Sequence, residues 1–172
     1  MAQGAVITFV LTITSGIIGS IVGFFVGWAR TSNSKIFYYL LGLYIDIIRS
    51  IPLILQFVLF NSFMAIAGYP MSPFFSGILT LSVYISGYVA EVVKAGIDSV
   101  PKVTRNSSRG LGMTYLQDFI FIVLPIGFRN VFPSWTGLML GLMKDTSLIA
   151  VMGATPPELL RASQIIINRI HE

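Results

Sequence analysis

Uncharged stretches long enough to cross a membrane dominate the pattern of hydrophobic and polar positions along the chain. The first covers residues 5–28, which is 24 residues without a charged side chain. A helix needs about 20 apolar residues to cross a hydrocarbon core of about 30 Å. The stretch is also longer than the apolar core of a signal peptide, and no basic residue precedes it. We therefore interpret it as a retained membrane span.

Three further stretches follow the same pattern. Residues 51–67 and 74–90 are each uncharged for 17 residues, and residues 130–152 are interrupted only by Lys144 and Asp145. Because backbone groups in lipid must be hydrogen-bonded within the segment, each stretch predicts a helix. The sequence thus predicts an all-α fold, a polytopic membrane helical bundle that forms a single domain over residues 1–172, with spans at about 5–28, 44–67, 74–94 and 128–152.

Composition supports lipid as the solvent of this chain. Hydrophobic residues make up 55% and charged residues only 10% of the chain, whereas soluble surfaces need about a quarter to a third of their positions charged. The net charge of +4 comes from bases scattered between apolar stretches, which argues against a nucleic-acid-binding surface. The chain has no Cys, and its one histidine is His171, so thiol chemistry is excluded and a zinc site is disfavoured.

Basic residues divide unequally between alternate loops. The loop after the first span and the segment over residues 91–129 together hold seven Lys and Arg side chains, while the opposite side holds only Arg161 and Arg169. Since Lys and Arg accumulate on the cytoplasmic side, this predicts an extracytoplasmic N-terminus. It also predicts a cytoplasmic loop at about 98–125 and an extracytoplasmic short helix at about 156–168.

Small residues recur every four positions in the first span, at Ser15, Gly19, Gly23 and Gly27. This spacing places them on one helical face, where another backbone can approach closely. We interpret the stripe as a packing surface, with a glycine hinge as the alternative.

Motifs for nucleotide hydrolysis and for other catalysis are missing from the sequence. There is no G-x-x-x-x-G-K-[ST] phosphate loop, no G-x-S-x-G and no H-E-x-x-H. The chain is therefore not expected to be an enzyme or to hydrolyse ATP by itself.

The predicted cytoplasmic loop has the pattern of two short helices separated at Gly110 and Gly112. Asp98 or Ser99 is expected to cap the first helix, with Pro101 at an early helical position. Gly112 permits a left-handed backbone angle that other residues resist.

The second short helix is expected to be capped by Thr114 and to carry apolar side chains beginning with Tyr115. Pro125 would end or kink it before the last membrane span. A rigid elbow with exposed apolar residues would result. The alternative is an amphipathic linker lying on the lipid surface.

The predicted cytoplasmic loop resembles the core of permease subunits of ATP-binding-cassette importers, particularly those for polar amino acids. That family carries E-A-A-x-x-x-G followed by L-P, and Gly112 and Pro125 match, while Asn106 replaces the acidic residue and Ser107 and Ser108 replace the alanines. The resemblance implies a type I importer fold and an ATPase-coupling loop. Its contact residues would be Asn106, Ser107, Ser108, Leu111, Gly112, Met113, Tyr115 and Pro125.

Three other stretches strengthen the resemblance to amino-acid permeases. Residues 49–56 are similar to R-G-T-P-L-L-x-Q, residues 144–148 are similar to K-D-T-S-L, and residues 157–162 are similar to the family's periplasmic segment. Family members continue into another membrane helix and a basic C-terminus, so the chain is expected to be truncated before that helix.

Charges inside membrane segments cost about 2.5 to 3.5 kcal/mol each, so they need a partner or a polar cavity. One interpretation is a local Asp46–Arg49 pair, snorkelling side chains at segment ends, and amides of Gln56 and Asn61 that bond across helices. The other is a polar path that recognises the carboxylate and ammonium of an amino acid. Its candidate residues are Arg49, Pro52, Gln56, Lys144, Asp145, Thr146 and Ser147.

Taken together, the resemblance implies the membrane-spanning subunit of an ATP-driven amino-acid importer in the bacterial inner membrane. It implies pairing with a second permease subunit, an ATPase dimer that holds ATP and Mg, and an extracytoplasmic amino-acid-binding protein. No cofactor is expected on this chain, and no nucleic acid. The alternatives are an ion-coupled secondary transporter or channel subunit, and a truncated remnant that does not transport.

Overall fold

Every regular element of the described chain is a helix. The computed structural model describes residues 2–32 and 34–147, and no strand occurs within them. The elements are α1 (Ala2–Arg30), α2 (Lys35–Ser50), α3 (Leu53–Ile66), α4 (Pro73–Asp98), α5 (Lys102–Gly110), α6 (Tyr115–Asp118), the π-helix η1 (Phe119–Val123) and α7 (Leu124–Asp145). The expected all-α fold is confirmed.

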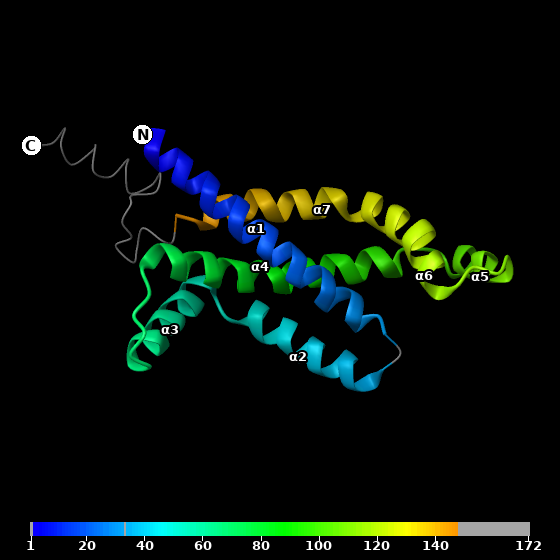
Figure 1. Cartoon of the computed structure of the whole chain (residues 1–172), viewed down its shortest axis with the longest axis horizontal. Coiled ribbons are helices and arrows are strands. Elements are labelled where there is room, and N and C mark those ends of the chain that lie inside the picture. Colours follow the sequence, from blue (N-terminus) through cyan, green and yellow to red (C-terminus); the bar gives the residue numbers. More distant parts are fainter. Residues whose placement is uncertain (1, 33, 148–172) are drawn as a thin grey trace, which may run out of the picture.

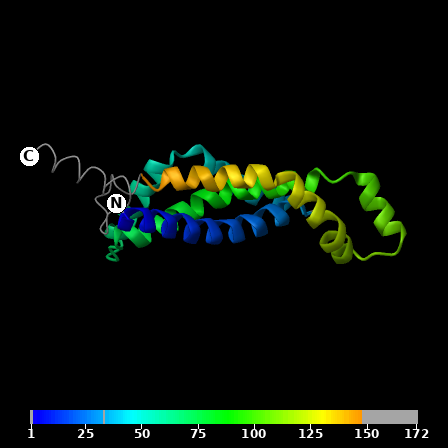
Figure 2. The same ribbon diagram turned by 90° about the horizontal axis from the view of Figure 1, so that it is seen from above.

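Helix α4 is the centre of the bundle. It contacts α1, α2, α3 and α7; α7 runs lengthwise beside it, and α1 crosses it obliquely (Figure 1). The N-terminus and α3 lie at one end of the bundle, whereas α5 projects from the other end (Figure 2).

Three helical segments are long and apolar enough to cross a membrane: Ala5–Arg30, Pro73–Asp98 and Tyr115–Asp145. A fourth span results if α2 and α3 are counted together, although they are bent by 103° where they meet. The sequence predicted one span over residues 44–67, so the bend is a correction. Its cause is Pro52, because a residue before proline avoids the helical region, and Ile51 is extended at φ −93° and ψ 123°.

The last described helix begins earlier than the expected span at 128–152. Helical residues continue from Tyr115 to Asp145, and Pro125 neither ends nor separates them. The π-helix accommodates this proline, since the Leu124 N–H bonds the Phe119 carbonyl and Pro125 falls in the first turn of α7. Residues 148–152, and the expected short helix at 156–168, lie outside the described residues.

Backbones of α1 and α4 approach closely along the glycine stripe. A Cβ added at Gly23 would lie 2.8 Å from the Ser86 carbonyl, and one at Gly27 would lie 2.4 Å from the Ala90 carbonyl. The Ser15 hydroxyl donates to the Ile78 carbonyl at 3.3 Å. The prediction that this stripe is a packing surface is confirmed.

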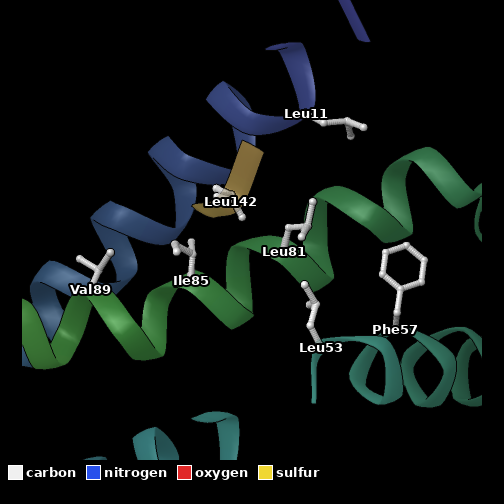
Figure 3. Packing of buried hydrophobic residues seen from close by; sticks show 7 residues of the cluster. All are labelled: Leu11, Leu53, Phe57, Leu81, Ile85, Val89 and Leu142. Atoms are coloured by element: carbon white, nitrogen blue, oxygen red, sulfur yellow. The ribbon is translucent and has the colours of Figure 1, made fainter. Parts of the chain in front are cut away.

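Two apolar clusters hold the helices together. The larger one joins α1, α3, α4 and α7 (Figure 3) through Leu11, Leu53, Phe57, Leu81, Ile85, Val89 and Leu142. The smaller one joins the end of α4 to η1 through Ile97, Val100, Phe119 and Val123. Because these side chains pack against one another where α4 ends and η1 begins, the smaller cluster anchors the base of the segment that carries α5.

Candidate functional site

The elbow, residues 102–118, is built around a tight helix end. The Gly112 N–H donates to the Arg109 carbonyl at 3.0 Å and the Met113 N–H to the Ser108 carbonyl at 3.2 Å. This pair of bonds is a Schellman motif, which requires a left-handed residue, and Gly112 has φ +87°. The expected conformation of Gly112 is confirmed, and it reverses the chain from α5 into α6.

The second short helix is capped as predicted. The Thr114 hydroxyl accepts from the Gln117 N–H at 3.3 Å, while the Gln117 side chain accepts from the Thr114 N–H at 2.9 Å. This reciprocal capping box starts α6 immediately after the turn.

The start of the first short helix differs from the prediction. Helix α4 continues to Asp98, and Ser99 is its C-cap instead of a cap for α5. The Lys94–Asp98 ion pair spans the last turn of α4 at 2.5 Å and stabilises that extension. Pro101 is the N-cap of α5 and makes no side-chain cap.

A buried carboxylate ties the two short helices together. Asp118 is 2% exposed and accepts a hydrogen bond from the Ser108 hydroxyl. Arg105 Nε lies 3.5 Å from the other Asp118 oxygen. Of these three residues, the sequence predicted only Ser108 as a site residue. Arg105 and Asp118 were not predicted, although the lengths of α5, the turn and α6 bring them together. The permease motif described above has alanine at the position of Ser108. In this chain the Ser108 hydroxyl forms the hydrogen bond to Asp118 within the elbow.

The remaining predicted coupling residues divide by exposure. Leu111 is 83% exposed and Tyr115 is 48% exposed, so both are available to a partner. Asn106, Ser107 and Pro125 are also exposed, whereas Met113 is half-buried.

A hollow of about 230 Å³ lies between α5 and α6. It is lined by Lys102, Arg105, Asn106, Arg109, Tyr115 and Asp118. The elbow therefore offers a cationic recess beside exposed apolar side chains.

Where α1 and α2 meet α4, the partly exposed side chain of Glu91 links two arginines from the other two helices. Its Oε2 atom lies 2.9 Å from Arg30 Nη1 and 3.6 Å from Arg49 Nη1. The local Asp46–Arg49 pair is not formed, and Asp46 makes no ion pair with any described residue. Arg49 turns toward α4 because Glu91 offers a carboxylate already close to Arg30.

Aromatic rings extend this polar region along α4. The Arg49 guanidinium lies 5.2 Å from the centroid of Tyr88, and Tyr88 packs on Tyr84 at 4.9 Å between centroids. These tyrosines were not among the expected site residues; their i, i+4 spacing in an uncharged span was the available signal.

The two amides of α3 have structural partners. Gln56 Nε2 donates to the carbonyls of Ile48 and Ile51 at 2.7 and 2.9 Å, so it bridges the bend beside Pro52. Asn61 Oδ1 accepts from the buried Ser76 hydroxyl at 2.8 Å and joins α3 to α4. The interpretation of Asn61 as a bond across helices is confirmed.

The other expected path residues lie at the end of α7. Lys144 is exposed, Asp145 and Ser147 are half-buried, and Thr146 is 1% exposed. The Thr146 hydroxyl bonds the Met143 carbonyl at 2.8 Å. In residues 2–32 and 34–147, no hydrogen bond or ion pair joins this group to Arg49, Pro52 or Gln56.

Comparison with known proteins covers nearly the whole chain. Residues 4–170 match the family described as binding-protein-dependent transport system inner membrane component. The arginine transport system permease protein ArtQ of Bacillus subtilis (strain 168) is 26% identical over 152 residues, which are 88% of this chain and 69% of that protein.

Two more comparisons agree with this match. The L-cystine transport system permease protein TcyB of Bacillus subtilis (strain 168) is 32% identical over 167 residues, covering 96% of this chain and 70% of TcyB. A crystal structure of an amino acid ABC transporter with histidines superposes with a TM-score of 0.89 at 27% identity, covering 99% of this chain and 79% of that one.

Proposed function

Because the chain belongs to the family of binding-protein-dependent transport system inner membrane components, we propose that it forms the translocation path of an ATP-driven amino-acid importer. The observation that carries the proposal is the likeness along the whole chain to permeases named for arginine and cystine transport. The structural likeness at TM-score 0.89 to an amino acid transporter supports it independently.

Coupling to ATP would occur through the elbow. ATP and Mg would bind to cytoplasmic ATPase subunits, since this sequence has no phosphate-binding loop. Closure of the ATPase subunits would carry the elbow with them. The Gly112 turn and the Asp118 contacts make the elbow stiff enough to transmit that motion to α7.

Amino-acid recognition would involve the polar region around Arg49. Its distance to Glu91, 3.6 Å, is longer than the 2.9 Å between Arg30 and the same oxygen. Arg49 is therefore the arginine more easily exchanged onto a substrate carboxylate. Lys144 and Asp145, at the end of α7, would contact the substrate from the other side of α4.

Partners of the assembly follow from the unburied apolar surface. Helices α2 and α3 expose large side chains such as Tyr39 (70%), Phe63 (68%) and Ile66 (86%). Lipid and a second permease subunit would cover them. We place the N-terminus outside and α5 in the cytoplasm, with an extracytoplasmic amino-acid-binding protein at the end of the bundle opposite α5.

Uptake into proteoliposomes tests this function. The subunit, reconstituted with an ATPase, a second permease subunit and a binding protein from the same organism, should accumulate labelled arginine, glutamine or cystine only with ATP and binding protein. Accumulation should survive a protonophore. Uptake that collapses with the proton gradient but continues without ATP would instead identify an ion-coupled carrier.

A further inference from the structure

We propose that a basic face of the elbow docks into an acidic groove of the ATPase subunit. The charge of this face is opposite to that of the acidic residue with which the E-A-A-x-x-x-G motif begins. This inference rests on the proposed function and adds the chemistry of the partner surface. It concerns α5 and the hollow beside it.

The first step is the charge of α5. Lys102, Arg105 and Arg109 follow at intervals of three and four, which places them on one helical face. The helix, Lys102–Gly110, contains no acidic residue. Asn106 lies within the same face, so the position where the family has an acid is neutral and flanked by cations.

The second step concerns the acid nearest to this face. Asp118 is 2% exposed and already accepts from Ser108 and Arg105. Its charge is directed inward and is unavailable to a partner. Lys102 and Arg109, by contrast, make no ion pair with any described residue and border the hollow of about 230 Å³. The recess fits a carboxylate side chain entering from another subunit.

The third step distinguishes a protein groove from a lipid surface. Val103 is 76% exposed and Leu111 is 83% exposed, one near each end of α5. Helix α5 also projects beyond the ends of the long helices instead of lying along them (Figure 2). Exposed apolar side chains thus lie on both sides of the basic residues, on a helix that projects away from the bundle. This arrangement fits a protein groove with an acidic rim better than a lipid surface.

Charge reversal provides the test. The complete complex, carrying an affinity tag on this subunit, is purified from membranes in low and high salt, and the retained ATPase is quantified. Arg109→Glu should lower retention by about tenfold in low salt, whereas Arg109→Lys should retain most of it. Asn106→Glu should also weaken retention. Lys35→Glu, a matched reversal at exposed Lys35 outside α5, should have no effect.

A photo-crosslinking residue at Ser107, which is exposed, identifies the surface directly. Crosslinks should map to an ATPase peptide that contains Asp or Glu, and a Lys replacement there should restore retention of Arg109→Glu.

Three outcomes would overturn the inference. Stronger retention of Asn106→Glu, or crosslinks to a basic peptide, would assign a basic groove while leaving the importer function intact. Crosslinks only to lipid, with the effect of Arg109→Glu limited to vesicles rich in phosphatidylglycerol, would assign a membrane surface. Failure of wild-type subunit to retain any ATPase, with uptake independent of ATP, would overturn the proposed function as well.

Discussion

Single buried polar residues set the geometry of the elbow. The carboxylate of Asp118 is buried, at 2% exposure. An ion pair with Arg105 and a hydrogen bond from Ser108 offset the cost of removing it from water. Burying an ion is costly unless it is paired and hydrogen-bonded. The position of α5 relative to α6 therefore depends on three side chains in addition to the backbone turn.

Arg105→Ala is expected to destabilise the subunit by about 1–3 kcal/mol, because it leaves Asp118 buried without its cation. The unfolding temperature of the full chain in detergent, monitored by size-exclusion chromatography after heating, measures the effect. Adding Asp118→Ala should recover part of the loss. Arg109→Ala is the control for stability, since Arg109 is exposed and its removal leaves no charge buried. Equal unfolding temperatures for Arg105→Ala and Arg109→Ala would contradict this role.

At the level of elements, glycine determines how closely helices approach and how they turn. Gly23 and Gly27 admit the backbone of α4, and Gly96 and Gly127 do the same between α4 and α7, where a Cβ on Gly127 would lie 2.8 Å from the Gly96 carbonyl. Gly112 serves a different purpose, because its φ of +87° allows the chain to reverse.

Gly23→Ala should destabilise the bundle by about 1–3 kcal/mol, since its Cβ would lie 2.7 Å from the Val89 Cβ and 2.8 Å from the Ser86 carbonyl. The control is Gly137→Ala in α7, where nothing lies within 4 Å and alanine favours the helix. Thermal unfolding of both variants compares the same added methyl group at two sites. A Gly23→Ala subunit as stable as Gly137→Ala would refute close α1–α4 packing.

Gly112→Val should leave the membrane helices intact and reduce ATPase retention and substrate-stimulated ATP hydrolysis. A β-branched residue at φ +87° costs about 1–3 kcal/mol and displaces Leu111 and Tyr115. Gly110→Val is the comparison, because Gly110 has no positive φ and nothing lies within 4 Å of an added Cβ. Equal coupling in the two variants would mean that the turn does not transmit motion.

For the whole molecule, the two ends of the bundle are chemically different. One end carries α5 with Lys102, Arg105 and Arg109, while the other carries the apolar connection between α3 and α4 around Tyr69. The membrane potential and the positive-inside rule act on such an asymmetry, and both favour the proposed orientation with α5 in the cytoplasm.

Cysteine labelling in intact cells tests this orientation in a chain with no native Cys. Ser107→Cys, on the exposed side of α5, should resist an impermeant thiol reagent until the membrane is permeabilised. Tyr69→Cys, at a residue 76% exposed at the opposite end, should react in intact cells. The reverse labelling pattern would invert the topology.

The sequence by itself determined the class of fold and several local features. Uncharged stretches near 20 residues long predict membrane helices because lipid offers no hydrogen bonds to an open backbone. The small-residue stripe through Gly23, the left-handed Gly112 and the cap at Thr114 are local or periodic signals, so they could be predicted without knowledge of neighbouring helices.

Only the tertiary structure decided which charged and polar side chains meet. Arg49 takes Glu91 instead of the nearby Asp46, because α2 packs against α4, 42 residues further along the chain. Asp118 becomes buried only when α5 folds back toward α6. The bend at Pro52 and the unbroken helix through Pro125 show the same dependence: proline limits the local backbone in both places, but the packing of neighbouring helices and a π-turn decide whether the helix ends.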